Sequence, residues 1–168
     1  LIVAALISDS PGLEITNVGM NPSRTGILQV LKKMGANIEI KNQRSDSGEP
    51  CADLFVKRSQ LKGIELSGEI IPNIIDEIPI ISVAAAFADG KTSIRDAKEL
   101  RVKESDRLKA VSEGFSALGI MHENFEDGMS IQGTTNKLKI DNSISIESHE
   151  DHRIAMSFLI AGINCSKP

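Results

Sequence analysis

Three stretches of the chain are apolar, rich in alanine and almost free of charge. They cover residues 2–9, 82–89 and 154–162. Alanine has the highest helix propensity, so these stretches favour helix over strand. A helix that is apolar on every side must also be buried on every side. We therefore expect three helices at the centre of the fold.

The segments after these helices form an internal repeat. In each of the first two copies, a strand is followed by an amphipathic helix with glycine just after its end, over residues 25–34 and 105–118. Further strands are expected at residues 13–18, 37–40, 54–56, 92–96, 129–131 and 144–146. A third copy begins at residue 154, and the polar stretch 41–50 is expected to be a surface loop. The sequence therefore predicts an α/β fold of βαβ-rich repeats, with helices inside and sheets facing outward.

Composition narrows the class of protein. The chain has 168 residues, 40% of them hydrophobic, which is enough for one domain with a real core. The net charge of −4 argues against a nucleic-acid partner. No apolar run is long enough to span a membrane, and the two cysteines lack metal or redox spacing, so we expect reduced thiols and a cytoplasmic location. The chain starts and stops beside apolar runs, without an initial Met, so we expect a piece of a longer protein.

Charged residues concentrate where helices are expected to begin. Lys103, Glu104 and Arg107 lie beside Ser105, a candidate N-cap. A helix N-terminus already favours anions, so added cations there make a seat for phosphate or carboxylate. Spacing alone favours the simpler alternative, a solvated first turn with ordinary salt bridges.

Two further charged segments precede the second and third apolar helices. Asp76 is a candidate N-cap, with Pro79 tolerated in the first turn. Asp151 is expected to cap the third helix, and Arg153 would stand at its N-terminus. His152 fits either a loop histidine or a functional one. A metal site with His149 is weakly supported, because no third ligand has suitable spacing.

Equivalent helix ends in successive repeats lie on one rim. Carboxylates and cations around a common rim are typical of an anionic small-molecule site. The sequence therefore predicts that these charged segments share one surface.

Four of these segments together resemble the EPSP synthase family of enolpyruvyl transferases. They are residues 101–108 (Arg-Val-Lys-Glu-Ser-Asp-Arg-Leu), 151–156 (Asp-His-Arg-Ile-Ala-Met), 76–79 (Asp-Glu-Ile-Pro) and 21–26 (Asn-Pro-Ser-Arg-Thr-Gly). The last is similar to the glyphosate-tolerant branch. The resemblance implies an inside-out α/β barrel of βαβαββ units. It also implies that residues 1–168 are one domain, most of the family's C-terminal domain, without the N-terminal domain or the extreme C-terminus.

The resemblance also implies an activity and roles for residues. Family members transfer the enolpyruvyl group of phosphoenolpyruvate to the 5-hydroxyl of shikimate 3-phosphate, in aromatic amino acid biosynthesis, and are glyphosate targets. By position, Asp76 is the base and contacts shikimate 3-phosphate, and Glu104 exchanges the proton at C3. Lys103 contacts shikimate 3-phosphate, while Arg107 and Arg153 hold phosphoenolpyruvate. No metal or organic cofactor is expected.

One position departs from part of the family, and other functions remain open. Some members have Asn in place of Glu99, and a carboxylate there would repel an anion, so no role is carried over to it. The alternatives are the related transferase acting on UDP-N-acetylglucosamine, and a non-catalytic binding domain of the same fold. The fragment alone is expected to be inactive, because the missing N-terminal domain supplies half of the site.

Overall fold

The computed structural model describes residues 1–135, 137–140 and 143–166. Helices and strands follow one another as the repeat predicts. The first copy comprises α1 (Ile2–Ile7), β1 (Leu13–Gly19), α2 (Gly26–Lys33), β2 (Asn37–Asp46) and β3 (Glu49–Lys57). The second comprises β4 (Glu65–Leu66), α3 (Ile71–Ile74), α4 (Ile78–Ala86), β5 (Lys91–Ile94), α5 (Arg107–Leu118), β6 (His122–Phe125) and β7 (Gly128–Gln132). The third copy contributes α6 (His152–Gly162).

The two sheets repeat the same topology. Among the described residues, one sheet has the order β1-β3-β2 and the other β4-β5-β7-β6. In both, the last strand of the unit (β3 or β7) lies between two others and pairs antiparallel with each, and in the second sheet β4 adds parallel to β5. The second copy is thus a complete βαβαββ unit, which confirms the predicted repeat and fold class.

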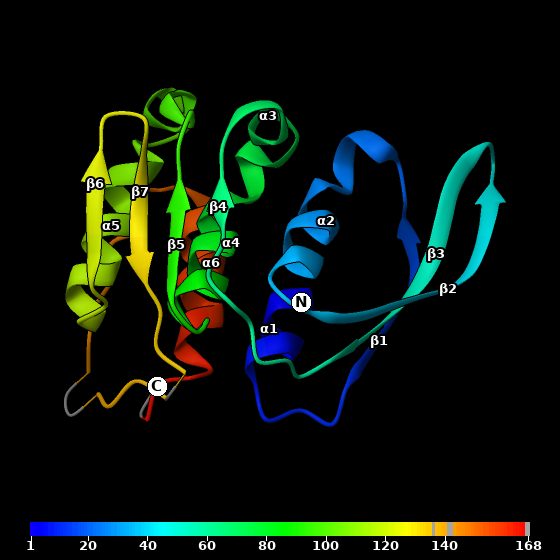
Figure 1. Ribbon diagram of the computed structural model, residues 1–168, viewed down its shortest axis with the longest axis horizontal. Coiled ribbons are helices and arrows are strands. Elements are labelled where there is room, and N and C mark those ends of the chain that lie inside the picture. Colours follow the sequence, from blue (N-terminus) through cyan, green and yellow to red (C-terminus); the bar gives the residue numbers. More distant parts are fainter. Residues whose placement is uncertain (136, 141–142, 167–168) are drawn as a thin grey trace.

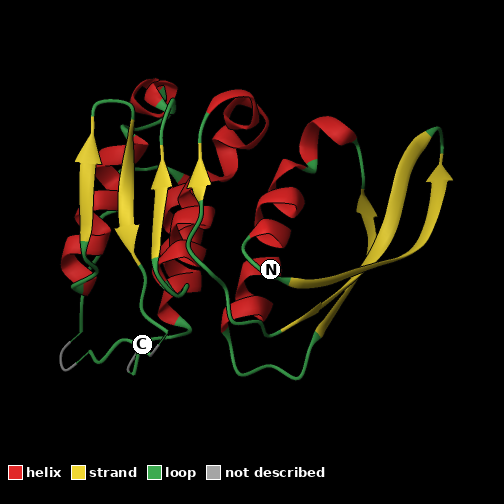
Figure 2. Cartoon of the chain, in the orientation of Figure 1, coloured by secondary structure: helices red, strands yellow, loops and turns green. Residues whose placement is uncertain are grey.

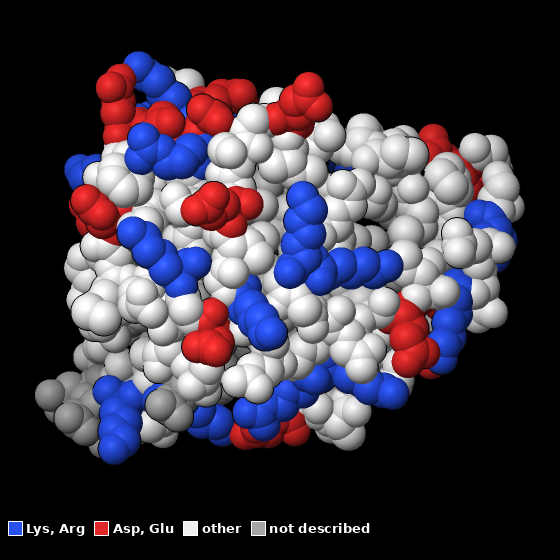
Figure 3. All heavy atoms as spheres, viewed as in Figure 1, with Lys and Arg blue, Asp and Glu red and all other residues white. Residues whose placement is uncertain are grey.

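The three apolar helices pack on one another, and α4 and α6 lie behind β4 and β5 in Figures 1 and 2. In α4 nearly every side chain is buried, and Pro79 stands in its first turn. Strand residues alternate, with Thr92 and Ile94 buried while Lys91 is exposed. Charged side chains of both signs are scattered among uncharged ones on the face seen in Figure 3, where the four-stranded sheet lies in front of its helices. The prediction of helices inside and sheets outside is confirmed for this packing.

The third apolar helix is only partly buried, contrary to expectation. In α6, Phe158 packs edge-on against Phe115 of α5, while Met156 is 55% and Leu159 73% exposed. Leu159 lines two grooves, of about 540 and 350 Å³. An apolar sequence predicts that a helix is buried, but it does not identify the element that packs against it.

Two local predictions are wrong. Residues 41–50 form the distal half of the β2–β3 hairpin instead of a loop. Its turn is made by Ser47 and Gly48, both at positive φ, which suits a two-residue hairpin turn. The strand expected at residues 144–146 is absent from the described chain, and β6 lies before β7 instead. No helix among the described residues is both long and apolar enough to cross a membrane.

Candidate active site

The predicted site residues lie at neighbouring helix starts. Asp76 belongs to a 3-10 turn (Ile75–Glu77) that leads into α4. Glu104 lies between another 3-10 turn (Lys98–Val102) and α5, Arg107 begins α5, and Arg153 lies in the first turn of α6. Ion pairs link these four residues directly, which confirms that their helix starts meet, although Arg107 itself is buried and Lys103 is not among the residues linked.

Arg107 is the centre of this cluster and is almost fully buried. Its Nε donates to Asp151 Oδ2 at 2.8 Å, and its Nη1 donates to Asp76 Oδ1 at 3.0 Å. Its Nη2 lies 3.8 Å from Glu104 Oε2. Burial by itself would lower the pKa of Arg107, but the bonds to these carboxylates raise it. The guanidinium is therefore fixed in place and permanently charged.

Asp151 holds both Arg107 and the start of α6. It is completely buried, and its Oδ1 accepts from the backbone amides of Arg153 and Ile154, which confirms the predicted N-cap. Its Oδ2 accepts from Arg107 and from the Ser105 hydroxyl. Burial favours a raised pKa, but these donors outweigh it, and the pKa of Asp151 lies below its ordinary value.

Asp76 bridges the two arginines. Its Oδ1 faces Arg107, and its Oδ2 lies 3.3 Å from Arg153 Nη2. Arg153 Nη1 also donates to the Asp76 backbone carbonyl at 3.1 Å. The expectation that Asp76 caps α4 is wrong, because its carboxylate is engaged by these guanidinium groups and α4 has no side-chain cap.

The structure gives Ser105 and Glu77 contacts that the sequence did not predict. Ser105 is not the cap of α5, because Asp106 accepts from the Lys109 amide and takes that role. Glu77 lies 3.7 Å from Arg153 and lines the 350 Å³ groove beside Asp76. Burial raises the pKa of Glu77, Arg153 opposes this, and Asp76 adds to it. The sequence signal for Glu77 was only its place next to Asp76.

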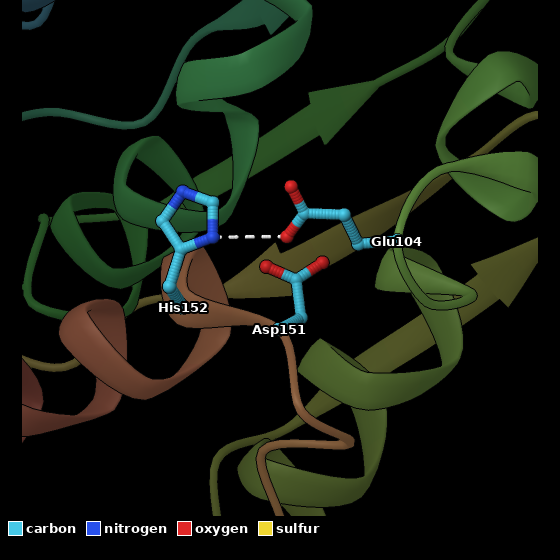
Figure 4. A group of neighbouring side chains, drawn as sticks. All are labelled: Glu104, Asp151 and His152. Atoms are coloured by element: carbon cyan, nitrogen blue, oxygen red, sulfur yellow. Dashed lines mark ion pairs between the residues drawn. The ribbon is translucent and has the colours of Figure 1, made fainter.

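Glu104 and His152 face each other across the cluster. Figure 4 shows the imidazole pointing at the Glu104 carboxylate with Asp151 beside it, and His152 Nδ1 lies 2.9 Å from Glu104 Oε2. Oxygen and nitrogen atoms of these three residues lie within 4.8 Å of one another. Asp151, however, already accepts four hydrogen bonds, and the adjacent guanidinium of Arg107 repels a cation. His149 bonds Glu113 instead. The geometry suits a proton-transfer pair better than a metal.

Lys103 has a carboxylate partner of its own. Its ammonium donates to Glu99, one helical turn earlier in the chain. With this pair included, the three predicted cations Lys103, Arg107 and Arg153 all carry a carboxylate partner. An anion that binds at the rim must therefore compete with carboxylates already present.

The comparisons with known proteins settle the family. A family model described as EPSP synthase (3-phosphoshikimate 1-carboxyvinyltransferase) matches residues 1–168. The chain belongs to the EPSP synthase family. A curated 3-phosphoshikimate 1-carboxyvinyltransferase of Petrotoga mobilis is 54% identical over 99% of this chain and 38% of its own length. That of Thermosynechococcus vestitus is 52% identical over 98% of this chain and 36% of its own length.

Solved structures of related enzymes show the same fold as this chain. An EPSP synthase from Acinetobacter baumannii superposes with a TM-score of 0.90 at 41% identity, covering 99% of this chain and 38% of that one. The enolpyruvyl transferase NikO from Streptomyces tendae has a TM-score of 0.68 at 18% identity over 99% of this chain and 35% of its own, which shows a shared fold. The chain thus spans well under half of the length of the relatives it matches.

Proposed function

We propose that the protein transfers the enolpyruvyl group of phosphoenolpyruvate to the 5-hydroxyl of shikimate 3-phosphate, with release of phosphate. Membership of the family and the names of its relatives support this reaction. The observation that carries the proposal is the Asp76 carboxylate between Arg107 and Arg153. Two guanidinium groups spaced to bind one carboxylate suit a substrate that carries a carboxylate and a phosphate.

The chemistry assigns a role to each group of the rim. The attacking hydroxyl must lose a proton, and Asp76 is the proposed base. C3 of phosphoenolpyruvate gains a proton as the new C–O bond forms at C2. It loses a proton when the C2–O bond to phosphate breaks. Glu104 is the proposed donor and acceptor at C3. Arg107 and Arg153 would hold phosphoenolpyruvate, and Lys103 would contact the shikimate 3-phosphate.

The proposal includes a second domain. We infer that residues 1–168 form most of a C-terminal domain and that an N-terminal domain completes the site. The chain spans 38% of its relative from Petrotoga mobilis, which leaves room for such a domain in the complete enzyme. The pairing of every predicted cation with a carboxylate also fits a half-site that needs further anion-binding groups.

The test is acceptor specificity in the full-length enzyme. Phosphate release is measured with phosphoenolpyruvate and either shikimate 3-phosphate or UDP-N-acetylglucosamine. Release only with shikimate 3-phosphate supports the proposal, and release only with the nucleotide sugar would replace it with the related activity. A cytoplasmic location stays a prediction from composition, and the status of a glyphosate target and membership of the tolerant branch stay predictions of the resemblance.

A further inference from the structure

The ion pair between Lys103 and Glu99 differs from the others at the rim. Glu99 lies in the first turn of the 3-10 helix (Lys98–Val102), and Lys103 follows that helix directly. The Lys103 side chain is 25% exposed, whereas that of Glu99 is 61% exposed. The carboxylate therefore lies on the solvent side of the ammonium.

The ion pair between Arg107 and Asp151 is held much more firmly than the pair between Lys103 and Glu99. Asp151 is completely buried and is also bound to two backbone amides, so it cannot leave without opening the start of α6. Glu99 has no such anchor among the contacts of the described residues, and an exposed pair spaced i,i+4 is only weakly stable. The rim thus combines a fixed ion pair at Arg107 with an exchangeable one at Lys103.

We propose that Glu99 sets the affinity for the acceptor, as an internal counterion that an anionic acceptor must displace from Lys103. The inference rests on the proposed function, since it takes shikimate 3-phosphate as that acceptor. The sequence alone gave Glu99 no role, because its carboxylate would repel an anionic substrate, and the proposal supplies one. Glu99 raises the acceptor concentration needed for binding, and it does so through Lys103.

The size of the effect follows from Coulomb's law. Two opposite unit charges about 4 Å apart in water attract each other enough that giving up the pair changes a binding constant about five-fold. Glu99→Gln removes this attraction and keeps the length of the side chain. In the full-length enzyme, the variant should therefore lower the KM for shikimate 3-phosphate about five-fold, with the KM for phosphoenolpyruvate changed less than about two-fold.

Glu39→Gln is the matched control. Glu39 lies on β2 in the three-stranded sheet and pairs with Lys41 and Lys57, and its replacement by Gln removes the same unit of charge. Both KM values should stay unchanged in this variant. An equal fall in KM for Glu39→Gln would mean that net charge, and not the contact with Lys103, sets the affinity.

A double-mutant cycle decides whether the effect passes through Lys103. In a Lys103→Met background, Glu99→Gln should change the KM for shikimate 3-phosphate less than about two-fold. A full five-fold fall in that background, or no fall in the wild-type background, overturns the inference.

Failure of the proposed function is recognised separately, because the wild-type enzyme would then not turn over shikimate 3-phosphate. In that case inorganic phosphate serves as the probe, titrated while the backbone amide of Lys103 is followed by NMR. Tighter phosphate binding in Glu99→Gln than in wild type and Glu39→Gln supports the counterion role, and equal binding overturns it.

Discussion

Asp151→Asn tests how the rim is held together. Asparagine keeps an oxygen that can accept from the Arg153 and Ile154 amides, but it places an NH₂ group where Arg107 Nε now donates at 2.8 Å. Two donors then face each other in a fully buried position. A hydrogen bond to a charged group contributes about 1.5–3 kcal/mol, and removing one partner of a buried ion pair costs about 3–5 kcal/mol. We expect the free energy of unfolding to fall by about 3–5 kcal/mol.

The assay is urea unfolding at pH 7, followed by circular dichroism and repeated at lower pH. Because the folded pKa of Asp151 lies below the unfolded value of about 3.9, its contribution is present above that value. The contribution is lost as the pH falls through the folded pKa. The difference between wild type and variant should therefore be full at pH 7 and shrink below about pH 4.

Asp46→Asn is the control for this experiment. Asp46 is exposed at the end of β2, where its carboxylate accepts from the Ser47 hydroxyl, and its loss should change stability by less than about 0.5 kcal/mol. A loss below about 1 kcal/mol for Asp151→Asn, or a loss that does not vary with pH, would refute the reasoning.

Further predictions concern activity and packing. In the full-length enzyme, Asp76→Ala and Glu104→Gln should each lower kcat by about 10²–10⁴-fold, as steady-state kinetics would measure; near-normal rates would remove both from the mechanism. Arg153→Ala should weaken phosphoenolpyruvate binding by about 2–5 kcal/mol, and unchanged binding in a fluorescence titration would contradict the clamp. Gly128→Ala should destabilise the fold by about 1–3 kcal/mol in thermal unfolding, because its Cβ would lie 1.9 Å from a backbone oxygen. Gly19→Ala, with open space at its Cβ, should be near neutral.

Much of the architecture could be predicted from periodicity. The uncharged alanine-rich runs became α1, α4 and α6, and the glycine after residue 118 ends α5 in the left-handed conformation. The hairpin at residues 41–50 could not be predicted, because both of its faces are exposed and its strands lack an apolar alternation. The exposed face of α6 was not predicted, because an apolar sequence indicates that a helix is buried but not which element packs against it.

The clustering of the candidate site residues was predicted, but the ion pairs between them were not. Helix starts on one rim correctly brought Asp76, Glu104, Arg107 and Arg153 together. Local rules gave Asp76 the role of a cap, whereas its partners come from segments 31 and 77 residues away in the chain. Such long-range pairs depend on how the repeats pack, which no local pattern encodes. The roles proposed for these residues remain predictions.

The central claim is that this rim is one half of an enolpyruvyl-transfer site. Transfer needs two substrates held in a fixed orientation, and an open rim with compensated charges cannot provide that alone. The most direct measurement is phosphate release from phosphoenolpyruvate and shikimate 3-phosphate by this chain, with and without a separately expressed N-terminal domain. The account predicts no release by the chain alone and restored release when the domain is added. Release by the chain alone, at the rate of the mixture, would contradict it.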